Sequence, residues 1–207
     1  MRATSLIRAL EAMASMEKGK PYSLRPEDAK RRLADDLARI CREADVKPVV
    51  IGGLAVNHHG YMRVTADVHI LVARKEAVAL YRRLRSESGW RRYAEGFKNT
   101  ELGIGLDICV EGERTAPRSV EEFPDPALLD TIDVDPLPVP TLPELLALKV
   151  MSGRARDDAD VVELLKRHRS RMASLKTAAS RRLRTAEARA RLTALVSRAK
   201  AEAARRR

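Results

Sequence analysis

Two acids and a histidine interrupt apolar runs, where such residues need a chemical or structural reason. Asp67 and His69 lie in the run VTADVHILV, and Asp107 lies in the later run LDICV. Successive side chains of a strand point to opposite faces, so Asp67 and His69 share one face, roughly 7 Å apart, with Val68 and Ile70 on the other. Because an unpaired buried carboxylate is unfavourable, each acid needs a partner or a ligand.

A shared role for the two acids requires that their strands be neighbours. Asp67 and Asp107 would then present oxygens to the hard cations that bridge the phosphates of a nucleotide. In the alternative interpretation, Asp67 caps a turn and Asp107 pairs with an arginine. Periodicity alone does not separate these interpretations.

A glycine pair precedes the strand that carries Asp67. In VVIGGLAVNHHG, an apolar run is followed by Gly52 and Gly53. A short segment with helical spacing comes next and ends at Gly60. Backbone N–H groups at a glycine turn and helix start can face an anion. We therefore predict a strand over 47–51, a short helix over 54–59 and a second strand within 63–73, a frame suited to phosphate chemistry.

Spacing of apolar residues predicts the other elements. Helices are expected over 4–17, 26–45 and 75–84, and strands over 90–94 and 102–110, separated by a turn region. Residues 111–140 indicate a loop with one extended piece near 132–134. Thr141 opens a helix with a T-x-x-E capping box through Glu144, and Asp157 or Asp158 caps the next helix.

Charge is distributed unevenly along the chain. The formal net charge is +11, and residues 169–207 carry 13 Lys and Arg against two acids, so this tail accounts for the whole excess. We predict N-terminal helices over 1–46 packed on a core over 47–168, followed by a basic helical tail over 169–207. Such a tail is typical of salt-dependent, largely sequence-independent RNA or DNA binding, although a solvated helix face or a segment covered by an acidic partner also fits.

Several classes of protein are disfavoured by composition. Cys41 and Cys109 are far apart in sequence, which gives no support to a disulfide framework or zinc site. No apolar run approaches the roughly 18 residues of a membrane span, and no signal peptide is recognisable. We therefore expect a cytoplasmic protein without membrane contact.

The string GGLAVNHHGYMRVTADVHILV resembles the nucleotidyltransferase superfamily of the DNA polymerase β type, especially the small bacterial AbiEii-type toxins and related toxin–antitoxin proteins. The family pattern is a GG or GS turn, a strand with two carboxylates one residue apart, and a third carboxylate on a later strand. Gly52 and Gly53 match the turn, Asp67 the first acid and Asp107 the third. The resemblance covers roughly residues 48–166 and implies an α+β nucleotidyltransferase fold, with a short mixed sheet flanked by helices.

One position departs from the family pattern. His69 stands where the family has its second metal-binding acid. Imidazole is a poor ligand for Mg2+ but acceptable to Mn2+ and softer ions. The position is consistent with a natural degenerate site, with a site adapted to another metal, or with a substitution that silences a toxic enzyme.

The resemblance also assigns residues to the nucleotide. Lys149 and Arg156 would contact its phosphates, and Arg63 would reach the same group. Asp157 and Asp160, in the string RARDDADVVELL, would order that loop or meet the nucleotide. Surface ion pairs are the alternative role for each.

Together these observations favour a metal-dependent nucleotidyltransferase that moves a nucleoside monophosphate from a nucleoside triphosphate to a hydroxyl on RNA, including a tRNA end, or on a protein. Asp67, His69 and Asp107 would hold Mg2+ or Mn2+, and a cognate antitoxin is an expected partner. The alternatives are a non-catalytic binding module on the same scaffold, acting through its tail or a partner, and an antitoxin-like structural partner.

Overall fold

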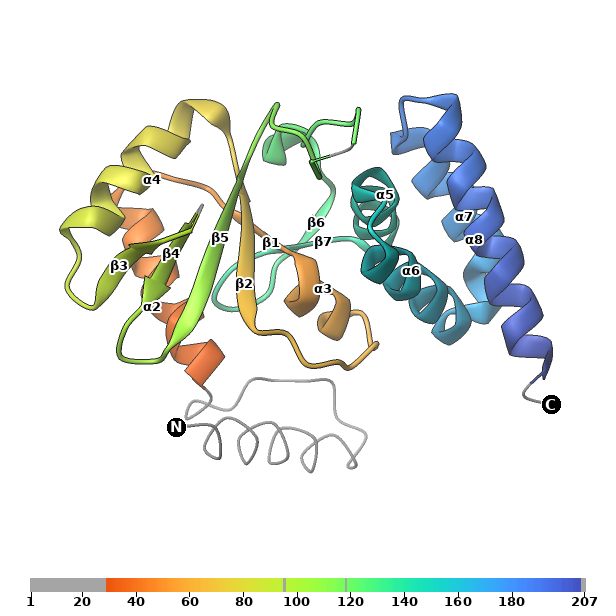
Figure 1. The fold of residues 1–207 in the computed structure, drawn as a ribbon, viewed down its shortest axis with the longest axis horizontal. Coiled ribbons are helices and arrows are strands. Elements are labelled where there is room, and N and C mark those ends of the chain that lie inside the picture. The colour runs from red at the N-terminus through yellow and green to blue at the C-terminus, as the bar shows by residue number, and fades with distance from the viewer. Residues whose placement is uncertain (1–28, 95, 118, 206–207) are drawn as a thin grey trace.

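A mixed β-sheet forms the centre of the protein. The computed structural model describes residues 29–94, 96–117 and 119–205, and within them five strands form one sheet in the order β1-β2-β5-β4-β3 (Figure 1). The strands are β1 (Val49–Ile51), β2 (Asp67–Val72), β3 (Trp90–Tyr93), β4 (Gly96–Asn99) and β5 (Ile104–Val110). β2 and β5 are parallel, and the other neighbours are antiparallel. The predicted α+β class with a short mixed sheet is confirmed.

Helices α2 (Ala29–Glu43) and α4 (Arg74–Ser86) cover one face of this sheet. Val68, Ile70 and Val72 of β2 point to this face and are fully buried against the leucines of both helices. The period-2 pattern of β2 therefore has the predicted consequence, because burying these three side chains turns Asp67 and His69 to the other face.

The remaining helices form a second group on the other side of the sheet (Figure 1). They are α3 (Gly52–His58), α5 (Leu142–Ser152), α6 (Ala155–Arg167), α7 (Met172–Arg182) and α8 (Ala186–Arg205). α5 is buried along most of its length, because Leu148 packs on Val49 and Leu71 of the sheet while other side chains of α5 pack among the helices.

The basic tail packs against the core. Leu175 of α7 and Leu192 and Val196 of α8 belong to the same hydrophobic cluster as α5 and α6. Three ion pairs support this packing: Arg182 with Glu144, Arg191 with Asp158, and Lys166 with Glu202. Apolar contacts thus cross residue 168, where the sequence suggested a boundary.

Three local predictions are corrected by the structure. The turn region after Trp90–Tyr93 contains strand β4, whose Phe97 is buried. The loop over 111–140 contains a 3-10 turn at Pro126–Leu128 and a two-stranded sheet of β6 (Thr131–Ile132) and β7 (Val139–Pro140). Thr141 precedes α5 but makes no side-chain cap; its backbone N–H donates to the Asp130 carbonyl, and Glu144 accepts from Arg182.

The predicted helix over 4–17 lies outside the described residues, as does the predicted start of the helix over 26–45. Within the part of the chain that the structure describes, no helix combines the length and apolarity needed to cross a bilayer.

Candidate metal and nucleotide site

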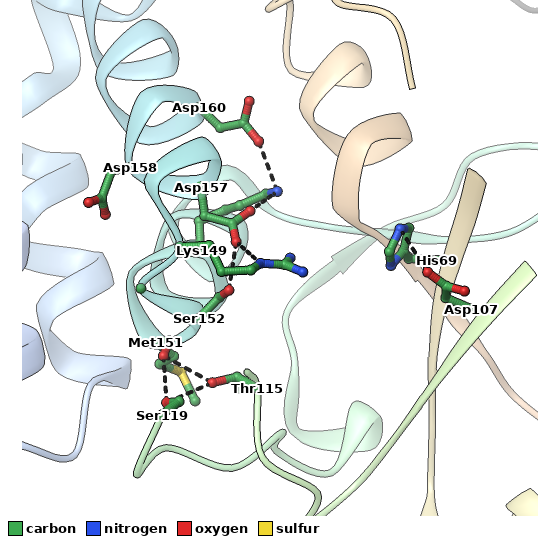
Figure 2. A network of polar contacts seen from close by, with 12 residues as sticks. His69, Asp107, Thr115, Ser119, Lys149, Met151, Ser152, Asp157, Asp158 and Asp160 are labelled. Atoms are coloured by element: carbon green, nitrogen blue, oxygen red, sulfur yellow. Dashed lines mark hydrogen bonds and ion pairs between the residues drawn. The ribbon is translucent and has the colours of Figure 1, made fainter. Parts of the chain in front are cut away.

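Asp67, His69 and Asp107 converge on the sheet face that points away from α2 and α4. His69 and Asp107 hold paired positions on the parallel strands β2 and β5, and Figure 2 shows their side chains next to each other. Nε2 of His69 lies 3.4 Å from Oδ2 of Asp107 and 3.6 Å from Oδ2 of Asp67. One ligand atom from each residue lies within 4.8 Å of the others. The carboxylates are 40% and 49% exposed, so a ligand can reach both.

The glycine pair lies directly against this triad of Asp67, His69 and Asp107. Gly52 has φ +71°, and a Cβ placed there would lie 3.1 Å from Cβ and Cγ of His69. A Cβ at Gly53 would lie 2.5 Å from Oγ1 of Thr65, whose hydroxyl donates to the carbonyl of Asp67 at 3.2 Å. Glycine is therefore required at both positions, and Thr65 couples the turn to the start of β2.

The imidazole of His69 is held neutral by its surroundings. Burial lowers its pKa, and Arg154 and Lys149 lower it further, while Asp107 and Asp67 raise it; the net pKa lies below the ordinary histidine value. A neutral ring nitrogen can bind a divalent metal. By contrast, burial raises the pKa of the neighbouring Cys109 thiol to about 12, so this sulfur stays protonated at neutral pH.

Two carboxylates and one neutral imidazole are a mixed donor set. Mg2+ favours an oxygen shell, whereas Mn2+ and Zn2+ accept imidazole nitrogen. The side chains present therefore fit a divalent cation, and they fit Mn2+ better than Mg2+.

A buried ionic network lies beside the triad, on α5 and α6. Nζ of Lys149 lies 2.5 Å from Oδ1 of Asp157 and 2.9 Å from Oδ2 of Asp160, and all three side chains are almost fully buried. Ser152 and Arg154 each donate to Oδ2 of Asp157 at 2.6 Å. Figure 2 shows Asp157 and Asp160 on the side of α6 near Lys149. Asp157 thus belongs to the first turn of α6 and is not its cap, and Asp158 pairs with Arg191 instead.

The loop between α3 and β2 is fastened to α6 by two arginines. Nε and Nη2 of Arg63 donate to both oxygens of Asp160, at 2.6 and 2.8 Å. The backbone of Arg63 exchanges two hydrogen bonds with the Asn57 side chain. Arg156 is exposed and donates to the carbonyl of Val64 at 3.0 Å. These contacts set the path of the chain into β2 and therefore the position of Asp67.

The predicted site residues thus form two adjoining groups. The triad and the glycines make one, and Lys149, Asp157 and Asp160 with Arg63 make the other. Of the two roles suggested for Asp157 and Asp160, their burial favours ordering the loop over meeting a nucleotide.

The sequence interpretation missed Arg154, although it stands two residues before Arg156 in the quoted string. Its side chain is 57% exposed, it pairs with Asp157, and its charge acts on His69. It is thus a positive group near the triad with donors left for an anion.

No protein-family model and no curated protein sequence matches the chain. Among solved structures, that of ANT(2")-Ia in complex with adenylyl-2"-tobramycin is similar to it, with a TM-score of 0.45 and 9% sequence identity, over 74% of this chain and 98% of that chain. What this protein does is therefore inferred from its own residues.

Proposed function

We propose that the protein is a metal-dependent nucleotidyltransferase that moves a nucleoside monophosphate from a nucleoside triphosphate to an acceptor hydroxyl. The observation that carries this proposal is the meeting of Asp67, His69 and Asp107, within 4.8 Å of one another and against the Gly52 turn. The resemblance of residues 48–166 to the nucleotidyltransferase superfamily supports the same reaction and a nucleotidyltransferase fold.

Each group of residues has a role in this proposal. Asp67, Asp107 and His69 hold the metal, which when bound neutralises phosphate charge and orients the triphosphate. Gly52 and Gly53 let the backbone approach the triphosphate, and Arg154 and Arg156 offer exposed guanidinium groups to its oxygens. The acceptor hydroxyl attacks the α-phosphorus in line with the departing pyrophosphate. Positioning and charge neutralisation then supply most of the rate enhancement.

Lys149 acts indirectly in this scheme. Its ammonium group is buried and pairs with Asp157 and Asp160, so it orders the first turn of α6, which carries Arg156 and follows Arg154. Arg63 couples the same network to the loop before β2. We infer that the network positions the phosphate-binding arginines relative to the triad.

RNA, including a tRNA end, is the acceptor that the tail favours, and a protein hydroxyl is the other acceptor class. A hollow of about 500 Å3 is lined by three cations and two hydroxyl residues of α7 and α8: Lys176, Thr177, Ser180, Arg181 and Arg189. Lys176, Arg181 and Arg189 have no carboxylate within ion-pair distance among the described residues. Cations and hydroxyl groups of this kind bind phosphate oxygens without reading sequence.

The family resemblance extends the proposal to a toxin of a toxin–antitoxin pair, with an antitoxin as its partner. His69 supports a second candidate, a binding module that keeps the nucleotidyltransferase scaffold but has lost turnover. Removing one negative charge from the metal site weakens cation binding, and Mg2+ is affected most.

Labelled-nucleotide transfer separates the two candidates. The chain and its His69→Asp variant are incubated with each of four labelled nucleoside triphosphates, with total RNA or total protein, and with Mg2+ or Mn2+. We expect the chain to transfer label with Mn2+ and the variant to transfer it with Mg2+ as well. Asp107→Asn is the matched control and should remove activity with both metals.

Each outcome decides between the candidates. Transfer by the variant alone means that the scaffold is catalytic and that His69 is the lesion. If neither protein transfers label to RNA or protein while RNA is retained through the tail, the binding module is correct and the transferase proposal is wrong.

A further inference from the structure

A groove lies on the α2 and α4 side of the sheet, opposite the face that carries the triad. This groove of about 840 Å3 is formed by α4 together with Arg92 of β3, Val110 of β5 and Glu113 after it. Val110 belongs to the hydrophobic cluster beneath α2 and α4, whereas Asp107 points to the opposite face. No residue of the triad or of the Lys149 network lines the groove. The groove is therefore separate from the candidate metal site.

Four arginines line this groove: Arg74, Arg82, Arg85 and Arg92. Among the residues that the structure describes, none of these guanidinium groups has a carboxylate within ion-pair distance. Arg83 on the same helix, in contrast, pairs with the acids at the end of α2 and just after α4. Within the described residues, the groove thus gathers arginines without an ion-pair partner, whereas the neighbouring Arg83 is neutralised.

Apolar side chains form the floor between these cations. Val78 is 66% exposed and stands between Arg74 and Arg82 on α4, in a stripe with spacing of four residues. Ala77 and Val110, only 8% and 6% exposed, lie at the bottom of the groove. Val78 is thus the exposed apolar side chain of the groove, and it lies between charged side chains.

We propose that this groove binds an acidic segment of a partner protein in which carboxylates flank apolar side chains. Carboxylates would form paired hydrogen bonds with the guanidinium groups of the four arginines, and an apolar side chain would cover Val78. The proposal does not depend on the transfer reaction, because the groove shares no residue with that site.

Two observations favour a peptide over RNA. Both surfaces carry hydroxyl groups, but the groove is also lined by the apolar residues Ala77, Val78 and Val110, whereas no apolar residue lines the hollow between α7 and α8. β3 is also the last strand of the sheet, so within the described residues its outer edge has backbone groups to which an extended peptide can add. Arg92 belongs to both β3 and the groove, so a peptide in the groove would lie beside this edge. Glu113 offers a partner to one basic residue in such a segment.

Fluorescence anisotropy with a labelled 12-residue peptide of alternating Glu and Leu tests the proposal, at 150 mM salt to limit non-specific attraction. The variant Arg82→Glu/Arg85→Glu should bind this peptide at least tenfold more weakly. The matched control is Arg181→Glu/Arg189→Glu, which changes the net charge equally but alters the other hollow, and it should change binding less than twofold. Thermal unfolding of both variants shows whether the fold is intact.

A further variant separates apolar contact from charge. Val78→Ser should weaken binding of the Glu–Leu peptide several-fold and leave binding of a Glu–Ser peptide of equal charge unchanged. If both double variants lose the same affinity for the peptide, binding depends only on net charge, and the proposal would be wrong. It would also be wrong if labelled single-stranded RNA, and not the peptide, lost affinity for Arg82→Glu/Arg85→Glu.

Discussion

The imidazole of His69 lies between two carboxylates, with its Nε2 3.4 Å from Asp107 and 3.6 Å from Asp67. Strand pairing fixes this arrangement, because His69 is opposite Asp107 on β5 and two residues from Asp67 on β2. Both distances exceed those of a good hydrogen bond. The three side chains are therefore close enough to bind one metal ion together, and they make no good hydrogen bond to one another.

Metal affinity follows from this donor set. We predict that the chain binds Mn2+ at least about tenfold more tightly than Mg2+, a difference of about 1.4 kcal/mol. His69→Asp should reduce that ratio, because an added carboxylate supplies the oxygen and the charge that Mg2+ requires. Isothermal titration of each metal into the chain and the variant measures the ratio. An unchanged ratio would exclude His69 as a ligand.

The Lys149 network makes Asp160 a large contributor to stability. Asp160 is almost fully buried and pairs with both Lys149 and Arg63. Asp160→Asn leaves the buried Lys149 and the partly buried Arg63 with one carboxylate fewer, and we predict a loss of roughly 3 kcal/mol in the free energy of unfolding. Asp158→Asn, on the same helix but in a more exposed pair with Arg191, should lose less, about 1 kcal/mol. Urea unfolding measures both, and similar losses would contradict the assigned role.

Low pH should weaken the Lys149 network, because it protonates Asp157. Burial raises the pKa of this carboxyl, but Lys149, Arg154 and Ser152 lower it by more, so the net pKa lies below the ordinary value. A lowered pKa in the folded state gives stability that is present above the unfolded-state pKa of about 3.9 and is lost as the pH falls through the folded-state pKa.

The difference in unfolding free energy between the chain and Asp157→Asn should accordingly be constant between about pH 5 and 7 and become smaller below about pH 4. Urea unfolding at a series of pH values gives this difference directly. A difference that stays constant down to pH 3 would show that the negative charge of Asp157 adds no stability.

Local patterns predicted the parts of the site that depend on strand periodicity. Alternation placed Asp67 and His69 on one face, and the structure agrees because Val68 and Ile70 are buried on the other. That β2 and β5 are neighbours was not readable from sequence, because residues 73–103 lie between them and any of several sheet orders satisfies the same pattern.

Long-range partners explain the predictions that failed. Glu144 fits a capping box with Thr141, yet it pairs with Arg182, 38 residues further along the chain and on a helix expected to be part of an appendage. Strand β4 has few strand-forming residues, but it pairs with both β3 and β5, and Gly96 lies so close to β5 that a Cβ there would be 2.1 Å from the Leu106 carbonyl oxygen. Neither contact can be recognised from the residues that are adjacent in sequence.

The tail offers a test of the boundary at residue 168. A chain that ends at residue 168 would expose the apolar sides of α5 and α6 that pack on Leu175, Leu192 and Val196. We predict that it loses cooperative urea unfolding and binds a hydrophobic dye. As a control, replacing the exposed Arg169, Arg171 and Arg184 by Gln removes positive charge without removing apolar contacts and should leave the transition cooperative. Cooperative unfolding of the shortened chain would show that residues 169–207 are a separate unit.

Gly53 tests the coupling between the glycine turn and the triad. Its added Cβ would lie 2.5 Å from Oγ1 and 2.7 Å from Cβ of Thr65, so Gly53→Ala should lower the free energy of unfolding by about 1–3 kcal/mol. Thr65→Gly should restore part of this loss in the double variant. Gly53 has no positive φ, so this loss measures the steric clash with Thr65 and not backbone strain. If the effects of Gly53→Ala and Thr65→Gly simply add, the two residues do not interact, since contacting residues give a non-additive cycle.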